Sequence, residues 1–159
     1  MYPLIILCGG KAKRLGHLAK ETPKSLLMVN KKPFLSYIIE NFAKQGVKDI
    51  YFCLGHLSDK FLEYLKENKV SGVNYFFSFD DNIFNGTGGA VKKISKKLKG
   101  PFFVTYGDSY LDIDLEDLIS KYKKNEGPLL TIFKNNGLYD KSNCKFNEGN
   151  ITYSKTKNL

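Results

Sequence analysis

Short apolar runs alternate along this chain with segments of helical periodicity, and this alternation strongly limits the folds it can adopt. The first run, Pro3–Cys8, has the continuous hydrophobicity of a strand buried on both faces. The next segment, Phe34–Gln45, carries apolar residues at helical spacing between Pro33 and Gly46. Strand and helix patterns that follow one another in this way predict a Rossmann-like three-layer α/β/α fold with a mostly parallel central sheet.

The remaining segments complete this pattern. Further strands are expected over 49–54, 73–79, 102–106 and 129–134, with a short extended stretch over 25–29 and a hairpin formed by 145–146 and 151–153. Further helices are expected from a cap at Ser58 to Glu67, from Gly88-Gly89 to Leu98, and over Leu115–Lys124 behind Asp114. In sheets of this kind, ligands bind at the carboxyl ends of the strands.

The length of 159 residues predicts a single domain, 1–159, with a core over 1–134 and a hairpin and tail over 135–159. No apolar run reaches the length of a membrane span, and the N-terminus has no signal-peptide pattern, so we expect a cytoplasmic protein without a membrane partner. The three cysteines are widely spaced, and none belongs to a CxxC motif. Free thiols, those of Cys8 and Cys53 buried, are therefore expected rather than a disulfide or a zinc site.

The formal net charge of +9 raises the question of a nucleic-acid partner. The basic residues are almost all lysines spread over the predicted helices, which favours a solvated surface, so nucleic-acid binding ranks last among the hypotheses. The only arginine, Arg14, lies instead in a glycine-rich loop, where a permanently charged donor fork suits phosphate.

That loop, Gly9–Gly16, directly follows the first predicted strand. Gly9 and Gly10 allow the backbone to turn tightly and to approach a ligand, while Lys11 and Arg14 add positive charge. The loop matches neither the Walker A motif nor the dinucleotide-binding GxGxxG motif. A plain turn is the alternative, but the preceding strand and the cations favour binding of a nucleoside triphosphate by its phosphates.

Three more motifs occupy loops of the predicted fold. Thr22-Pro23-Lys24 would hold Lys24 in a fixed position, or it is a turn with a surface lysine. The stretch 85–90 reads NGTGGA, which suits close approach of a base or sugar at a helix N-terminus, or is a turn capped by Thr87. Asp108 ends the strand over 102–106 and can hold Mg²⁺, or it caps the next turn, with Asp112 and Asp114 as competitors.

Taken in order, GGKAKRL, TPKSL, GTGGA and YGD resemble the motifs of the sugar-phosphate nucleotidyltransferases, within roughly residues 3–119. Together with the stretch 32–50, GTGGA is most similar to the branch of heptose and mannose 1-phosphate guanylyltransferases. The resemblance implies the nucleotide-diphospho-sugar transferase fold and transfer of a nucleoside monophosphate, with GTP favoured, to a heptose or hexose 1-phosphate. Pyrophosphate is the second product, and the sugar nucleotide would serve cell-surface polysaccharide synthesis.

The resemblance also implies roles for individual residues, with Mg²⁺ as cofactor. Arg14 and Lys24 would be catalytic, and Asp108 would bind the metal. The nucleotide would be held by Leu7, Gly9, Gly10, Lys11, Asn85, Gly86, Thr87 and Gly88.

The chain departs from the family pattern in three places. Ala12 replaces the third glycine of the loop, and alanine disfavours positive φ. The stretch 81–85 replaces a Glu-x-x-Pro-Leu motif, which leaves base recognition open. The segments that supply the acceptor site and a second aspartate in the family have no counterpart, so a nucleotide-binding module with weak or no catalysis is the alternative. A homo-oligomer is compatible with either hypothesis.

Overall fold

The computed structural model describes residues 1–10, 12, 15–16, 21–80, 86–125, 127–138, 142 and 144–154. These residues form two compact units, Met1–Leu115 and Glu116–Leu159, each of which is described by itself. The expectation of a single domain with a core that ends at residue 134 stays a prediction.

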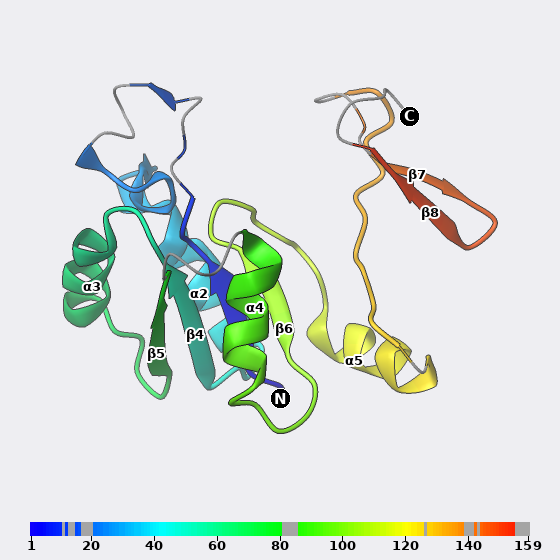
Figure 1. Cartoon of the computed structure of the whole chain (residues 1–159), viewed down its shortest axis with the longest axis horizontal. Helices are drawn as coiled ribbons and strands as arrows, with labels where there is room; N and C mark the ends of the chain where they lie inside the picture. The colour runs from blue at the N-terminus through cyan, green and yellow to red at the C-terminus, as the bar shows by residue number, and fades with distance from the viewer. Residues whose placement is uncertain are drawn as a thin grey trace. The chain divides into compact units, whose positions relative to one another are not determined.

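The first unit is built on a four-stranded parallel sheet (Figure 1). Its strands are β1 (Leu4–Leu7), β4 (Asp49–Leu54), β5 (Asn74–Phe79) and β6 (Phe103–Tyr106), in the order β5-β4-β1-β6. β1 is an inner strand, and its residues Leu4, Ile5 and Ile6 have no exposed surface. Burial on both faces explains the uninterrupted apolar run with which the chain begins.

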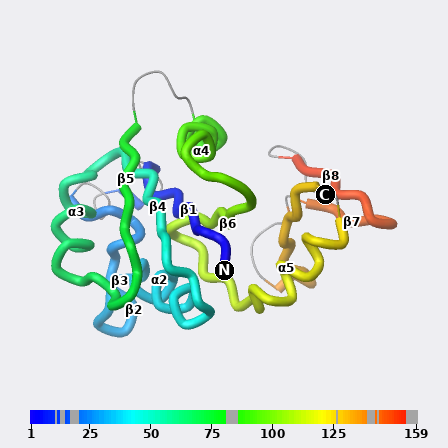
Figure 2. The backbone as a smooth tube through the Cα atoms, turned by 90° about the horizontal axis from the view of Figure 1, so that it is seen from below, coloured from blue at the N-terminus to red at the C-terminus, as the bar shows by residue number. Residues whose placement is uncertain are grey.

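Helices cover both faces of this sheet, which confirms the predicted three-layer α/β/α fold. Figure 2 shows α4 (Thr87–Ser95) on one face, with α2 (Phe34–Lys44) and α3 (Ser58–Glu67) on the other. Ile94 of α4 packs against Ile5 and Cys53 in one core cluster. The predicted apolar stripe of α2 is also buried; its members are Leu35, Ile38, Ile39 and Phe42.

A compact turn leads from the glycine-rich loop to α2. The expected extended stretch over 25–29 is only partly correct, because a 3-10 helix η2 (Lys24–Leu26) comes first, followed by β2 (Met28–Val29) and β3 (Lys32–Pro33). The Leu26 N–H donates to the Pro23 carbonyl at 2.9 Å, which closes the 3-10 turn directly after the proline. Lys24 therefore starts a rigid turn rather than a strand.

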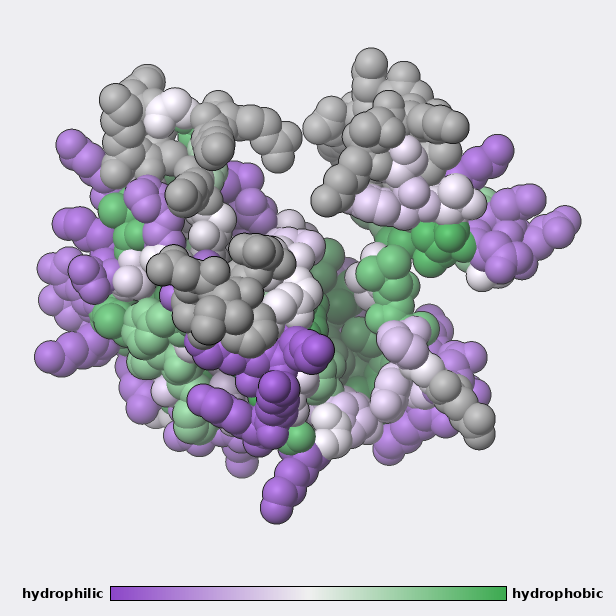
Figure 3. Space-filling model, viewed as in Figure 1, coloured by the Kyte–Doolittle hydropathy of each residue, from purple (hydrophilic) through white to green (hydrophobic). Residues whose placement is uncertain are grey.

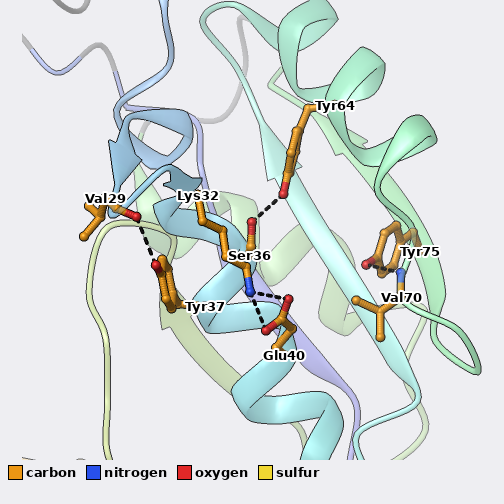
Figure 4. Close-up of polar contacts among 8 residues, drawn as sticks. All are labelled: Val29, Lys32, Ser36, Tyr37, Glu40, Tyr64, Val70 and Tyr75. Atoms are coloured by element: carbon orange, nitrogen blue, oxygen red, sulfur yellow. Dashed lines mark hydrogen bonds and ion pairs between the residues drawn. The ribbon is translucent and has the colours of Figure 1, made fainter.

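Polar contacts fasten this turn to the helices beneath it (Figure 4). The Tyr37 hydroxyl of α2 donates to the Val29 carbonyl at 2.9 Å, and Lys32 pairs with Glu40 at 2.6 Å. Ser36 and Tyr64 share a hydrogen bond between α2 and α3. The first two links hold β2 and β3, which follow η2, against α2, and the third joins α2 to α3.

Two predicted helix ends are wrong. α3 begins at Ser58, but Leu57 stands at the N-cap in a left-handed conformation (φ 58°), so Ser58 is the first helical residue and not the cap. α4 ends at Ser95 instead of Leu98, because the chain then turns through the Lys97-to-Ile94 and Leu98-to-Ser95 backbone hydrogen bonds.

α5 (Leu115–Lys124) begins at the last residue of the first unit and otherwise belongs to the second, which also contains the hairpin of β7 (Cys144–Asn147) and β8 (Asn150–Tyr153). Both α5 and the hairpin confirm the predictions. The strand expected over 129–134 is absent: these residues pair with no strand in the described part of the chain. Leu130 and Phe133 are 67% and 75% exposed. A strand forms only when it pairs with a neighbouring strand, and an apolar, β-branched sequence does not by itself provide one.

No helix among the described residues is both long and apolar enough to cross a bilayer. All three cysteines are free, with Cys8 and Cys53 buried, as the sequence predicts.

Candidate functional site

The carboxyl ends of the four parallel strands lie along one edge of the sheet, and α4 starts at the same edge (Figure 1). Small or acidic residues follow each strand at this edge. They are Gly9 and Gly10 after β1, Gly55 after β4, Asp80 after β5, and Gly107 with Asp108 after β6. Glycines let backbones approach each other closely here, and the two carboxylates give the edge its polar character.

Gly107 brings the ends of β1 and β6 together with η2. Its N–H donates to the Leu7 carbonyl at 3.0 Å. A Cβ at this position would lie 2.5 Å from Cys8 Sγ and 2.8 Å from Ser25 Oγ, both well inside van der Waals contact. Only glycine therefore fits between these two buried side chains.

This packing places Lys24 and Asp108, the neighbours of Ser25 and Gly107, against each other. Lys24 Nζ lies 2.8 Å from Asp108 Oδ2, and the two side chains are 42% and 37% exposed. An ion pair this open to solvent adds only about 0–1 kcal/mol to stability. Its importance is positional: residues 84 apart in the chain bring a cation and a carboxylate to one point of the sheet edge.

Asp80 lies against the backbone of the glycine-rich loop. A Cβ on Gly9 would come 2.7 Å from Asp80 Oδ2, and a Cβ on Gly55 would overlap the same oxygen. The Asp80 N–H donates to the Leu54 carbonyl at 2.8 Å, which fixes the position of this residue at the end of β5. Gly9, Gly55 and Asp80 thus form a second close contact, between β1, β4 and β5.

The start of α4 exposes Gly86, Thr87 and Gly88. Gly86 has φ 89°, a conformation that favours glycine, and no side chain caps the helix. Thr87 therefore does not act as the cap that the alternative interpretation assigned to it. An uncapped helix N-terminus presents backbone N–H groups and a partial positive charge, which suit an anionic or polar ligand.

Three residues of the predicted site, Lys11, Arg14 and Asn85, lie outside the described residues. Within the same loop, Ala12 has φ 45° and accepts a hydrogen bond from the Leu15 N–H at 2.9 Å. The expectation that alanine keeps this position out of the left-handed region is wrong. A hydrogen-bonded turn in the loop holds Ala12 there, at a cost on the order of 1–2 kcal/mol.

The two buried thiols at this edge are not nucleophiles at neutral pH. Burial raises the pKa of Cys8 well above its ordinary value, and burial together with the Asp80 carboxylate raises the pKa of Cys53 to about 11. Because the thiolate is the reactive form, both side chains stay protonated and inert. The chemistry available at the site is therefore that of cations, backbone amides and carboxylates.

The residues also fit a divalent cation. Mg²⁺ is usually held by one or two carboxylates, with waters and substrate phosphates as its other ligands. Asp108 offers one half-exposed carboxylate, and the Lys24 ammonium bound to it shows that a cation is accommodated there. No cluster of three or more metal-binding side chains occurs among the residues described, so the remaining ligands would have to come from elsewhere.

The structure thus joins Lys24 directly to Asp108 and places Leu7, Gly9 and Gly10 at the same edge. Sequence reasoning missed Asp80 and Gly55. Their signal was positional, because each directly follows a strand at the edge where ligands bind.

The sequence and the fold of this chain are similar to those of known proteins. Residues 4–140 match the model of the family described as nucleotidyl transferase. The chain is 36% identical over 137 residues to D-glycero-alpha-D-manno-heptose 1-phosphate guanylyltransferase of Campylobacter jejuni, covering 86% of this chain and 59% of that protein. It is 31% identical over 119 residues to the enzyme of the same name from Aneurinibacillus thermoaerophilus, covering 74% and 51% of the two chains.

Among solved structures, HddC from Yersinia pseudotuberculosis superimposes with a TM-score of 0.69 and 31% identity, over 76% of this chain and 54% of that chain. The same protein has also been crystallised in a complex with GMP-PN. This chain therefore spans between half and two thirds of the length of these relatives.

Proposed function

Since this chain belongs to the nucleotidyl transferase family, we propose that it transfers a nucleoside monophosphate from a nucleoside triphosphate, with GTP favoured, to a sugar 1-phosphate. Two of its relatives are named heptose 1-phosphate guanylyltransferases, and a structural neighbour was crystallised with GMP-PN. A third relative is named UTP–glucose-1-phosphate uridylyltransferase, which differs in both base and sugar. The choice of GTP and of a heptose or hexose 1-phosphate is therefore part of the proposal. We also propose that the protein is cytoplasmic and that its sugar nucleotide serves cell-surface polysaccharide synthesis.

The contact between Lys24 and Asp108 supports this proposal, because it brings a cation suited to phosphate and a carboxylate suited to Mg²⁺ to the edge where the glycine-rich loop begins. Gly9, Gly10 and the exposed start of α4 offer backbone N–H groups to the triphosphate and the nucleoside. Lys24, together with Arg14 and Lys11 of the loop, would stabilise negative charge as the acceptor phosphate attacks the α-phosphorus. The acceptor is already an anion at neutral pH, so no protein nucleophile is needed.

Magnesium would be held by Asp108, and when bound it would neutralise charge on the triphosphate. Catalysis would otherwise rest on positioning and electrostatic stabilisation. The hydrogen-bonded turn at η2 and the glycine at 107 keep the backbones of Lys24 and Asp108 in place before the ligand arrives, so only their side chains would have to exchange partners.

The test is pyrophosphate release with four nucleoside triphosphates, each paired with heptose, mannose and glucose 1-phosphates. We expect the highest rate with GTP and with heptose or mannose 1-phosphate. Lys24→Ala should lower turnover on the order of 10²–10³-fold, by analogy with the loss of one oxyanion donor. Lys121→Ala removes an exposed helix-surface pair with Asp117 and is the matched control, with unchanged turnover.

Full turnover by the Lys24→Ala protein would refute the assigned role of this residue. Absence of pyrophosphate release with every pair of substrates would refute the transferase activity of this chain. In that case calorimetry with GTP and CTP separates the alternative, a nucleotide-binding module, from a chain that binds neither.

A further inference from the structure

Three polar residues, Tyr37, Asn41 and Gln45, form a polar stripe along α2 and its C-terminal cap. They are spaced by four residues, so they lie on one side of the helix, and all three are half-buried. Polar residues on the outer side of a helix ordinarily face water, as the hydrophilic surface over α4 does in Figure 3. The side chains of the polar stripe instead form hydrogen bonds with the backbone of two segments that lie far apart in the chain.

The first of these segments follows Lys24. The Tyr37 hydroxyl donates to the Val29 carbonyl at 2.9 Å, in the short strand that comes after η2 (Figure 4). The Phe34 N–H, at the start of α2, donates to the Leu27 carbonyl at 3.0 Å. The turn that begins at Lys24 is therefore joined to α2 through its backbone.

The second segment follows Asp108. Asn41 Nδ2 donates to the Leu111 carbonyl at 2.9 Å, and the Leu115 N–H donates to Gln45 Oε1 at 2.9 Å. Gln45 Nε2 also donates to Asn41 Oδ1 at 3.3 Å, so each amide has partners on both its nitrogen and its oxygen. Residues 109–114 form neither a helix nor a strand, and these contacts tie them to α2.

The contacts of the polar stripe differ in kind from the ion pair at the sheet edge. In the reaction proposed above, Lys24 and Asp108 release each other to bind a phosphate and a metal, and the direct link between their segments is lost. The contacts with α2 remain, because they use the backbone of these segments. Tyr37 and Asn41 are one helical turn apart, which separates their two attachment points by about 6 Å along the axis of α2.

We propose that Tyr37, Asn41 and Gln45 are positioning residues of the nucleotidyl transfer, an inference that rests on the proposed function. α2 would keep the segment after Lys24 and the segment after Asp108 at a fixed separation while their side chains bind the ligand. The complex of Mg²⁺ with a triphosphate needs both segments at once, whereas a metal-free triphosphate needs only the cations. Loosening one segment should therefore weaken binding of GTP with Mg²⁺ more than binding of GTP alone.

Asn41→Asp tests this proposal, with Asn68→Asp as the matched control. Asn41→Asp keeps the size of the side chain and an acceptor for Gln45, but it cannot donate to the Leu111 carbonyl. Asn68→Asp removes the same kind of hydrogen bond, from Nδ2 to the Tyr64 carbonyl at 3.0 Å, at the end of α3. Far-UV circular dichroism establishes that each variant is folded before it is compared.

Calorimetry with GTP, with and without Mg²⁺, is the first measurement. We expect Asn41→Asp to weaken binding of GTP with Mg²⁺ roughly tenfold, because a half-buried acceptor loses its donor. The effect without the metal should be smaller, and Asn68→Asp should bind like the unmodified chain. Amide hydrogen exchange without ligand is the second measurement, and it should be faster over residues 109–115 in Asn41→Asp alone.

Faster exchange with unchanged affinity would show that the polar stripe only stabilises the fold, and it would overturn the proposal. Unchanged exchange, or an equal loss of affinity in Asn68→Asp, would overturn it as well. If Asn41→Asp does not fold, Tyr37→Phe decides by the same calorimetry, with a loss of about two- to tenfold expected from the missing hydroxyl. An unmodified chain that binds no GTP would instead refute the proposed function itself, so the two failures are distinguishable.

Discussion

A methyl group added at Gly107 would enter a tightly packed point of the first unit. The Gly107→Ala methyl would start 2.5 Å from Cys8 Sγ and 2.8 Å from Ser25 Oγ, whereas ordinary van der Waals contact begins at 3.4 Å. The neighbours must therefore move apart by about 0.9 Å (3.4 less 2.5) and 0.6 Å (3.4 less 2.8). Both are buried, 6% and 5% exposed, so neither can swing into solvent.

Overpacking of this kind costs about 1–3 kcal/mol. Because one methyl displaces buried atoms on two different elements, we expect the upper part of that range, about 2–3 kcal/mol. For a chain of this length such a loss lowers the melting temperature by roughly 4–12 °C. The chain has no tryptophan, so urea unfolding followed by far-UV circular dichroism is the appropriate assay. Gly127→Ala is the control, because no atom lies within 4 Å of its added methyl and its φ is not positive.

A double-mutant cycle tests the cause of the loss. Cys8→Ala removes the sulfur that the new methyl approaches most closely, so it should partly rescue Gly107→Ala, with a coupling energy of about 1 kcal/mol or more. Additive effects within about 0.5 kcal/mol, or a Gly107→Ala protein as stable as the control, would refute the packing argument.

Four further predictions have defined outcomes. Asp108→Asn should weaken the Mg²⁺ dependence of GTP binding, while Lys24 keeps its place in η2. Calorimetry with and without the metal measures this dependence, and an unchanged dependence would contradict the assignment of Asp108 as the metal ligand. Ala12→Gly should raise the free energy of unfolding by up to about 1 kcal/mol, because glycine adopts φ 45° without strain but loses more chain entropy; a clear loss of stability would show that Ala12 is not strained. The pKa of Cys53 is about 11 in the fold, above its value in the unfolded chain. Its contribution to stability is therefore complete below about pH 8.5 and disappears as the pH rises toward 11. A free energy of unfolding that does not fall over this pH range would contradict the burial of Cys53. At pH 8, Cys144 should be the thiol that reacts rapidly with a disulfide reagent, while the other two react only after unfolding; rapid reaction of all three thiols in the native protein would contradict their burial.

The parallel sheet was predictable because strands buried on both faces have continuously apolar sequences. β1 and β4 read as continuous apolar runs, and the structure buries them as inner strands. The helix α5 begins and ends at the predicted residues, since its apolar spacing and acidic first turn define it locally. In contrast, the stretch 129–134 has the composition of a strand, but pairing depends on a neighbour that composition does not reveal.

The contact between Lys24 and Asp108 was predictable only as two separate hypotheses. Each residue stood at the end of a motif, and the family resemblance gave each a role, but their 2.8 Å contact depends on how closely η2 approaches β6. That approach is set by the missing side chain of Gly107, which no local pattern distinguishes from any other turn glycine. Asp80 was missed for a similar reason, because its importance comes from the two glycine backbones against which it lies.

The ion pair at the site edge has a thermodynamic consequence. Before any ligand arrives, the ammonium of Lys24 and the carboxylate of Asp108 neutralise each other, so neither is fully available to a partner of its own. Binding of a cation to Asp108 would free Lys24 to bind a phosphate, and binding of a phosphate to Lys24 would free Asp108 to bind a cation. The two events are therefore linked, and by reciprocity each must raise the affinity for the other by the same factor. A site arranged in this way favours a metal and a triphosphate arriving together over either one alone.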